Sequence, residues 1–250
     1  MNVLGVILAR ATSAGLKKKH LLPLLGRPVI TYAFEHARAA RRLSRVVVSS
    51  DCPDVLRLAA GAGLETIVRP AGLATAEASV QDVMLHALEQ VELRPGFRAD
   101  ALVVLYGNVP VRPVGAIDRA IAVLRDTGCD SVRTFCPVGK WHPAWMAQLA
   151  GDRVLPLHAG SIHRRQDLPP LFLHDGAVVA VSRASMLRGR TNSEDPHAFF
   201  GADRRGFAVE IGQTVEIDHL RDLYWAEAVL RDSSHSQAPP ARRDELRKAS

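Results

Sequence analysis

The sequence predicts a three-layer α/β protein built on a mostly parallel sheet. Short apolar runs rich in Val, Leu and Ile recur at residues 3–9, 45–50, 65–68 and 101–105. Segments with helical periodicity separate these runs, and such alternation is typical of a parallel sheet covered by helices on both faces. At 250 residues the chain can bury a large core. We therefore expect one domain over residues 1–231, followed by a flexible basic tail over residues 232–250.

Helices are predicted wherever apolar residues recur with i, i+3, i+4 and i+7 spacing. A further helix is expected to begin near Asp51, because Pro53 then takes an early helical position. The chain should return to the sheet at residues 176–182, add a strand region at 206–218 and end in a helix that begins near Leu220. The periodic residues are Ile30, Ala33, Phe34 and Ala37, then Val80, Val83, Met84, Ala87, Leu88 and Val91, then Ile117, Ala120, Ile121 and Leu124.

The strand–helix pattern breaks between about residues 136 and 175, where prolines interrupt it repeatedly. Two of the three tryptophans, Trp141 and Trp145, lie in this stretch. We expect an excursion from the main sheet, on which exposed aromatic residues would form a subunit contact. The alternative is that the two indoles simply cover the core.

Composition narrows the classes of function. The formal net charge is +6, but part of the excess lies in residues 241–248, so we expect a basic tail rather than a nucleic-acid partner. The three cysteines are odd in number and lack metal-ligand spacing, which indicates neither a disulfide framework nor a zinc site and fits the cytoplasm. The run at residues 3–9 has no basic segment before it, so a buried strand is expected rather than a signal peptide. No apolar run approaches the length of a membrane span.

Residues 10–19 join the first apolar run to three consecutive lysines through the small residues Ala11-Thr12-Ser13-Ala14-Gly15. Small residues let backbone N–H groups approach an anion, and the flanking cations supply charge. The spacing matches neither the Walker pattern nor the dinucleotide fingerprint. The stretch is therefore either a loop for an anionic ligand such as phosphate or a plain solvated lysine turn.

Three loops are expected to meet at one edge of the sheet. They follow Ala9, Val68 and Leu105, which end predicted parallel strands. Ligands of such sheets bind beyond the carboxyl ends of the strands. Arg10, Arg69 and the loop of residues 106–112 should therefore converge on one site.

Two acidic residues near the end of the predicted domain are candidate metal ligands. Glu216 and Asp218 are two apart, so both carboxylates leave the same face if the segment is extended. Mg²⁺ is typically held by one or two carboxylates together with substrate phosphates and water. The competing interpretation is that Asp218 only caps the helix that begins near His219.

Several short motifs follow one another in a characteristic order over residues 3 to about 231. They are Leu8-Ala9-Arg10 with Ser13, Gly15 and Lys19; Val47-Val48-Ser49-Ser50-Asp51; Arg69-Pro70 with Leu73-Ala74; Pro110 with Arg112; His142-Pro143; Arg165-Gln166 with Leu168-Pro169; Gly176-Ala177; and Glu216-Ile217-Asp218. Together they resemble the acylneuraminate cytidylyltransferases, which join CMP to sialic acids and related sugar acids. The resemblance implies a Rossmann-like nucleotidyltransferase sheet with a small dimerisation arm.

The resemblance implies a role for each matching residue. The family's reaction is attack by a sugar-acid hydroxyl on the α-phosphorus of CTP, with release of pyrophosphate. Arg10 and Lys19 then contact phosphate, and Asp218, joined by Glu216, binds Mg²⁺. The implied partners are CTP or another nucleotide, a sugar acid and a second copy of the chain. The nucleotide-binding residues are Arg10, Ser13, Gly15, Lys19, Arg69 and Ser79; the substrate-binding residues are Tyr106, Asn108, Arg112, Arg165, Gln166 and Asp175.

The departures from the family pattern leave other functions open. His20 and Val80 replace an Asn and a Ser that help the family read cytosine, and Tyr106 replaces a Gln that faces the sugar acid. Asn108 stands where related sugar-nucleotide transferases carry a metal-binding Asp, and Asp175 where the family has Asn. The alternatives are a nucleotidyltransferase for another base or sugar, and a nucleotide-binding subunit that has lost catalysis.

Overall fold

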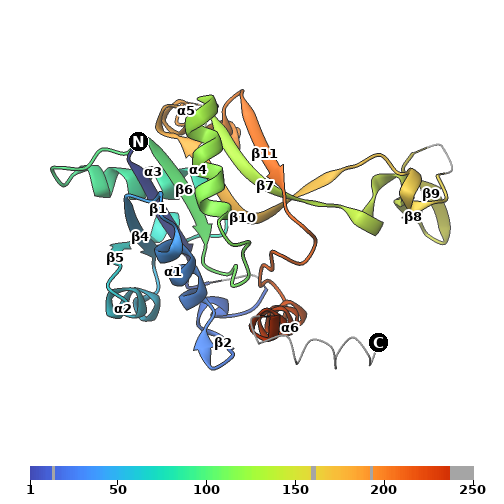
Figure 1. Ribbon diagram of the computed structural model, residues 1–250, viewed down its shortest axis with the longest axis horizontal. Helices are drawn as coiled ribbons and strands as arrows, with labels where there is room; N and C mark the ends of the chain where they lie inside the picture. The colour runs from blue at the N-terminus through green and yellow to red at the C-terminus, as the bar shows by residue number, and fades with distance from the viewer. Residues whose placement is uncertain (13–14, 159–161, 192–193, 237–250) are drawn as a thin grey trace.

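Seven strands form the central sheet in the order β11-β7-β10-β6-β1-β4-β5 (Figure 1). The computed structural model describes residues 1–12, 15–158, 162–191 and 194–236. β10 is antiparallel to its neighbours β6 and β7, and the other pairs are parallel, so the predicted mostly parallel sheet is confirmed. The strands are β1 (Val3–Ala9), β4 (Arg45–Ser50), β5 (Glu65–Val68), β6 (Ala101–Tyr106), β7 (Ser131–Pro137), β10 (Phe172–Ser182) and β11 (Arg204–Ala208).

Strand β1 lies at the centre of the core and is buried along its whole length. Its side chains alternate between two hydrophobic clusters. Val3 and Ile7 pack on one face of the sheet, and Leu4 and Val6 pack on the other. A strand covered on both faces needs a continuous apolar run rather than an alternating one, which is what residues 3–9 supply.

Helices cover both faces of the sheet. α1 (Ile30–Ala39), α2 (Pro53–Gly61) and α4 (Ala116–Thr127) pack on the face of Ile7, where Figure 1 shows α1 and α4 in front of the sheet. α3 (Val80–Glu92), α5 (Arg183–Gly189) and the short helix η6 (Ala198–Phe200) pack on the opposite face. The helices predicted from apolar spacing are therefore confirmed, and α2 begins at Pro53 as expected.

The last helix, α6 (Leu220–Ser236), packs against residues 24–32 rather than on the main sheet. A third cluster joins Ala226 of α6 to Tyr32 and Ile217. The helix continues past Asp232, where we predicted the tail to begin, and residues 237–250 lie outside the described part. No helix in the described residues is long and apolar enough to cross a membrane.

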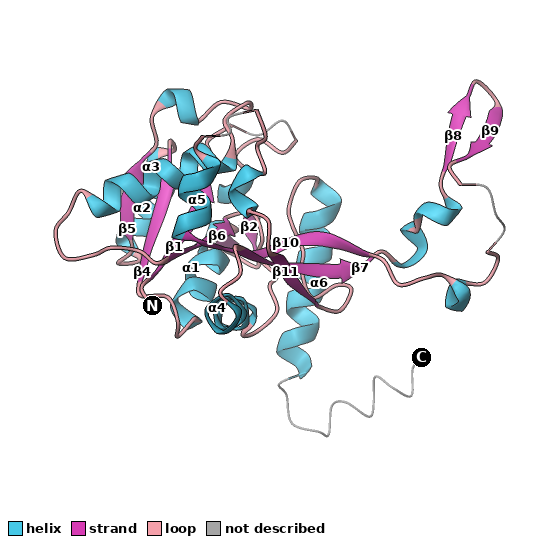
Figure 2. Ribbon diagram, turned by 90° about the horizontal axis from the view of Figure 1, so that it is seen from above, coloured by secondary structure: helices cyan, strands magenta, loops and turns pink. Residues whose placement is uncertain are grey.

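Residues 138–171 form an arm that leaves the sheet at the end of β7 and returns at β10. Figures 1 and 2 show it projecting away from the rest of the molecule. A hairpin of β8 (Ala147–Ala150) and β9 (Arg153–Pro156) lies in it, and every residue of both strands is exposed. Trp141 and Trp145 are 69% and 40% exposed, so they do not cover the core.

Short elements complete the chain. The expected strand region at 206–218 is only partly a strand, since β11 ends at Ala208 and Val215 forms an isolated bridge with Val111. The remaining elements are β2 (Pro23–Leu24), β3 (Arg27–Pro28) and the 3-10 helices Lys19–Leu21, Ala71–Leu73, Gly139–Trp141, Pro143–Trp145 and Arg165–Asp167.

Candidate active site

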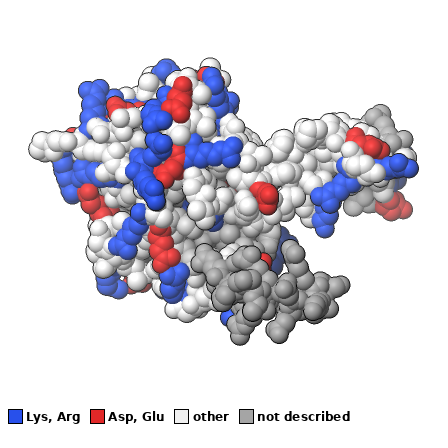
Figure 3. All heavy atoms as spheres, in the orientation of Figure 1, with Lys and Arg blue, Asp and Glu red and all other residues white. Residues whose placement is uncertain are grey.

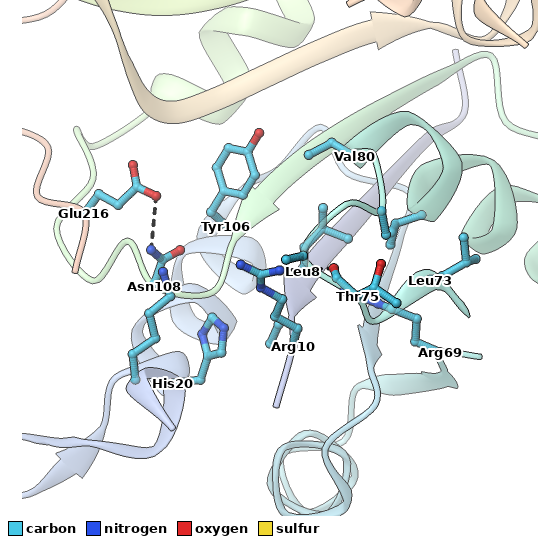
Figure 4. A pocket seen from close by; sticks show the side chains of 15 residues that line it. Leu8, Arg10, His20, Arg69, Leu73, Thr75, Val80, Tyr106, Asn108 and Glu216 are labelled. Carbon is cyan, nitrogen blue, oxygen red and sulfur yellow. Dashed lines mark hydrogen bonds between the residues drawn. The ribbon is translucent and has the colours of Figure 1, made fainter. Parts of the chain in front are cut away.

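A pocket of about 260 Å³ lies beyond the carboxyl ends of β1, β5 and β6 (Figure 4). Arg10 follows β1, Arg69 follows β5 and Tyr106 ends β6, so the structure brings together the three loops whose convergence the sequence predicts. Lys19 and Glu216 join them from distant parts of the chain. The pocket thus combines three cations with carboxylate chemistry at the edge where parallel sheets bind ligands.

The two arginines of the pocket are held by backbone carbonyls. Arg69 is 6% exposed and donates to the Ser49 carbonyl at 2.8 Å and the Ser49 hydroxyl at 3.3 Å. Burial lowers the pKa of Arg69, and the charge of Asp51 opposes that shift. Arg10 donates to the Thr75 carbonyl at 3.1 Å. Neither guanidinium forms a salt bridge within the described residues, which leaves their charge for a ligand.

Lys19 closes the opposite side of the pocket by pairing with Asp218. The Lys19 Nζ to Asp218 Oδ1 distance is 2.7 Å, and the lysine side chain is 13% exposed against 51% for the aspartate. Gly15 lies against the same segment, because a Cβ at this position would sit 2.4 Å from the Asp218 carbonyl oxygen. Only glycine fits this approach without a shift. The lysine-rich loop is therefore docked on the acidic segment, and Ser13 lies outside the described residues.

Glu216 and Asp218 leave the same side of an extended segment, as their spacing predicts. Val215 and Ile217, on either side of Glu216, are 2% and 0% exposed, and the Ile217 N–H donates to the Asn108 carbonyl at 2.8 Å. The Asn108 amide Nδ2 donates to Glu216 Oε1 at 3.1 Å, the contact dashed in Figure 4. Desolvation raises the pKa of Glu216, and the charge of Asp218 adds to the rise while the Asn108 hydrogen bond opposes it.

The helix-cap interpretation of Asp218 finds no support in the described residues, where no amide of α6 donates to its carboxylate. The backbone N–H groups of Asp218 and His219 donate to Asp222 Oδ2 at 3.0 and 2.7 Å. The Asp218 carboxylate instead contacts Lys19. Sequence reasoning missed Asp222, although an acidic residue in the first turn of a helix is a usual signal for such contacts.

The wall of the pocket near β6 and α3 is largely uncharged. His20 is 4% exposed, and burial lowers its pKa to about 4, with the charge of Lys19 adding to the effect. Its Nδ1 has no hydrogen-bond partner among the described residues. Burial also raises the pKa of Tyr106 to about 12, so the phenol stays protonated. Ala78 and Val80 line the pocket, whereas Ser79 between them caps α3 by accepting from the Asp82 N–H at 3.0 Å.

Arg112 does not line the pocket but supports it from the protein interior. It is 6% exposed, and its three guanidinium nitrogens contact the Ala177 carbonyl at 2.6 Å, the Tyr106 carbonyl at 3.3 Å and His36 Nδ1 at 2.8 Å. Burial lowers the pKa of Arg112 to about 10, and that of His36 to about 3, so His36 is the neutral acceptor. The resemblance assigns Arg112 to substrate binding; in this structure its guanidinium links the Tyr106 carbonyl at the end of β6 to the Ala177 carbonyl of β10.

Three further predicted substrate residues lie away from the nucleotide pocket. Asp175 accepts from the Thr214 hydroxyl at 2.7 Å and from the Ala177 N–H at 3.2 Å. With Arg165 it lines a second, largely apolar pocket of about 690 Å³ at the base of the arm. Gln166 is exposed on the arm beside Arg165. Within one chain these residues do not join Arg10 and Lys19.

The fold and the pocket together define a nucleotidyltransferase: a mostly parallel sheet with cations and an acidic pair beyond its strand ends. The family model described as Cytidylyltransferase matches residues 4–192, and the chain belongs to that family.

Known proteins agree with this assignment. N-acylneuraminate cytidylyltransferase of Streptococcus agalactiae serotype III (strain NEM316) is 27% identical over 195 residues, which cover 76% of this chain and 46% of the relative. The chain thus spans about half the length of that relative. Post-translational flagellin modification protein B of Campylobacter coli is 22% identical over 234 residues, which cover 93% of this chain and 97% of that protein. The structure of CMP:2-keto-3-deoxy-manno-octonic acid synthetase complexed with CTP shares the fold, with a TM-score of 0.71 and 20% identity over 93% of this chain and 100% of that chain.

Proposed function

We propose that the protein transfers CMP from CTP to a sialic-acid-like sugar acid and releases pyrophosphate. The observation that carries this proposal is the meeting of Arg10, Lys19 and Arg69 with Glu216 in one pocket of a cytidylyltransferase-family fold. A triphosphate needs such a concentration of cations, and the named activity of the Streptococcus relative supplies the acceptor class.

The protein's role in this reaction is to align the two substrates and to stabilise charge, and no covalent intermediate with the protein is needed. The acceptor hydroxyl gives up its proton to solvent and forms a new P–O bond to the α-phosphorus while the bond to pyrophosphate breaks, and negative charge grows on the phosphate oxygens. Arg10 and Lys19 stabilise that charge, because preorganised cations are worth more in a desolvated site than in water. The contacts of Arg69 to Ser49 hold its guanidinium in place before the nucleotide binds.

We propose Mg²⁺ as the cofactor, held by Asp218 with Glu216. The residues fit: the Glu216 and Asp218 carboxylates both lie within 3.5 Å of the Asn108 amide nitrogen, and the Asp218 side chain is 51% exposed. No group of three or more His, Cys, Asp or Glu residues is placed for a metal in the described chain, but Mg²⁺ commonly uses only one or two carboxylates besides phosphate oxygens. When bound, the ion neutralises phosphate charge.

A second candidate is a nucleotidyltransferase for another base. The observation in its favour is the pocket wall, where Val80 offers no hydrogen bond and neutral His20 offers fewer than an amide would. A third is a nucleotide-binding subunit without catalysis, which the neutral Asn108 beside the acidic pair would suit.

We also propose that two copies of the chain associate through the arm. Leu149 and Val154 of the hairpin are 74% and 64% exposed, as are Trp141 at the base of the arm (69%) and Leu173 on β10 beside it (63%). Several exposed apolar residues on one projecting element mark an interaction surface. Association would bring Arg165 and Gln166 of one copy toward the site of the other.

Pyrophosphate release over the four nucleoside triphosphates and several sugar acids, with and without Mg²⁺, tests these proposals together. We expect CTP with a sugar acid to give the highest rate and to need the metal. A preference for another triphosphate selects the second candidate. Nucleotide binding without turnover for any pair, in protein of normal thermal stability, would favour the third.

A further inference from the structure

Arg133 is a partly buried cation that faces the same side of the sheet as Tyr106. It lies on β7, where Val132 packs into the core shared with α4 and Arg133 points to the opposite face. Its guanidinium lies 4.3 Å from the ring centroid of Phe200 and 5.3 Å from that of Phe135. Two aromatic rings therefore hold the charge in place by cation–π contacts.

Neighbouring residues fix the two aromatic rings that contact Arg133. Gly206 on β11 pairs with Arg133, and a Cβ at Gly206 would lie 2.5 Å from the Phe135 ring, so glycine makes room for that ring. Phe200 is 5% exposed and stacks on His197 with ring centroids 5.6 Å apart. The Arg133 guanidinium thus packs on aromatic rings that are themselves held in place.

Arg133 has no acidic partner. It forms no salt bridge within the described residues, and its Nε is buried without a hydrogen-bond partner. Partial burial of an unpaired charge is costly unless a counter-ion supplies the missing contacts. Proteins rarely leave such a group unless it has a further role.

The surroundings add positive rather than negative charge. Arg204 also lies over Phe200, at 5.8 Å, and it lowers the pKa of Arg133 further after burial. Asp175, an acid on the neighbouring strand β10, already accepts hydrogen bonds from Thr134 and Thr214. An anion from outside the chain is therefore the partner that this cluster lacks.

The cluster adjoins the nucleotide pocket without belonging to it. Arg133 does not line that pocket, but Tyr106 does, and the charge of Arg133 acts on the Tyr106 hydroxyl. In Figure 4 the Tyr106 ring extends away from Arg10 and His20. A ligand that reaches past Tyr106 from the reacting phosphate would meet Arg133.

We propose that Arg133, seated on Phe200 and Phe135, binds the carboxylate of the acceptor sugar acid. This inference rests on the proposed function, which supplies an acceptor with one carboxylate. The phosphates are accounted for by Arg10, Lys19 and Arg69, so the carboxylate is the remaining anion of the two substrates. Arg133 then selects acidic acceptors over neutral sugars.

The test compares Arg133→Gln with the matched variant Arg119→Gln. Arg119 also lies over a phenylalanine, Phe207, at 4.1 Å, but on α4 and away from Tyr106. Pyrophosphate release is measured with CTP and with N-acetylneuraminate, 3-deoxy-manno-octulosonate and their methyl esters. For Arg133→Gln we expect the KM of the acids to rise about 10- to 100-fold, the scale for a hydrogen bond to a charged group. The KM for CTP should stay unchanged, which also shows that the variant is folded.

The outcomes separate this inference from the proposed function. Wild-type protein should prefer each acid to its ester, Arg133→Gln should lose that preference, Arg133→Lys should restore part of it, and Arg119→Gln should keep it. Normal wild-type turnover with the acid preference intact in Arg133→Gln would overturn the inference alone. Absence of turnover with every sugar acid in the wild type would overturn the proposed function, and this inference with it.

Discussion

The two halves of the candidate site are built in different ways. The nucleotide half consists of Arg10, Lys19 and Arg69, which stand at strand ends or on a loop docked on Asp218. The proposed acceptor half consists of Tyr106 and Arg133, together with Arg165 and Asp175 of the second pocket. The first half is assembled within one body of the chain, whereas the second reaches from the sheet to a projecting arm (Figure 2).

Charge also separates the two halves, as the surface view of the body and arm illustrates. Lysines, arginines and acids are interspersed over the body, while the base of the arm is mainly neutral in the view of Figure 3. Phosphate binding depends on cations that strand ends hold rigidly. In the proposed acceptor half, apolar walls and a few charged groups would contact the sugar acid, so acceptor preference can diverge while the phosphate chemistry is kept. The predictions below run from the largest expected effect to the smallest.

The nucleotide half should be the more sensitive to mutation. Lys19→Ala or Arg10→Ala should lower kcat/KM for CTP by about 10²- to 10³-fold, the scale for losing a charged transition-state contact. Steady-state pyrophosphate release measures the effect. Lys17→Ala is the matched control from the same loop and should be nearly silent, because Lys17 does not line the pocket. Equal effects of Lys17 and Lys19 would mean that the loop acts only through net charge.

Mutation of the two acidic residues, Glu216 and Asp218, should affect the Mg²⁺ requirement unequally. Asp218→Asn should raise the Mg²⁺ concentration needed for half-maximal turnover by about 10- to 100-fold, because a charge-assisted contact is lost. Glu216→Gln should be milder, since the raised pKa of Glu216 shows that its charge is already disfavoured and Asn108 already binds it. The thermal shift caused by nucleotide is measured with and without Mg²⁺. An unchanged metal-dependent shift in Asp218→Asn would remove it from the metal site.

The acceptor half should depend on association. Leu149→Asp places a charge on the exposed hairpin and should raise the dissociation constant of a dimer by about tenfold to 100-fold, since buried apolar anchors dominate interfaces. Sedimentation velocity measures it. Val114→Asp is the control, because Val114 is exposed outside the arm. A protein that is monomeric before mutation would contradict the proposed association.

The contact between Arg112 and His36 should make the stability of the protein sensitive to acid. The pKa of His36 is depressed to about 3 in the folded protein, so its contribution to stability is present above its unfolded pKa of about 6.5 and falls as the pH drops toward 3. Acidification from pH 7 to 5 should remove about 1 to 2 kcal/mol of unfolding free energy at this residue. His36→Gln keeps an acceptor for Arg112 without titrating, so urea unfolding at the two pH values should show a smaller loss. An equal loss in both proteins would place the acid sensitivity elsewhere, with buried His20 as the next group to change.

The smallest effect is expected at Tyr106. Tyr106→Gln replaces a ring by an amide that both donates and accepts. If the residue faces the acceptor, the ratio of rates between N-acetylneuraminate and other sugar acids should move toward N-acetylneuraminate by up to about tenfold, the scale of one hydrogen bond. Competition assays with paired acceptors measure the ratio. The same ratio before and after mutation would place Tyr106 outside the acceptor contacts.

The sequence alone was enough for the sheet, most of the helices and the strand-end loops. Residues 3–9 were predicted to be a strand covered on both faces, because a short, continuous apolar run that alternates with helical segments is typical of a buried parallel strand. Arg10 and Arg69 could be placed in one site for the same reason, since parallel strands end at a common edge. The family could be identified because its motifs lie within these local segments.

Only the tertiary structure decided which distant groups meet. Lys19 and Asp218 are 199 positions apart, and nothing in either local sequence shows that they pair or that Gly15 must lie against the Asp218 backbone. The packing of α6 decided that Asp222 accepts the two amides just before the helix, while the Asp218 carboxylate pairs with Lys19. Arg112 and Arg133 are both arginines after or within strands, yet one is enclosed by carbonyls and the other lies unpaired on aromatic rings. Local periodicity fixes which face of an element is buried, whereas the partner that meets that face is set by packing between segments remote in the chain.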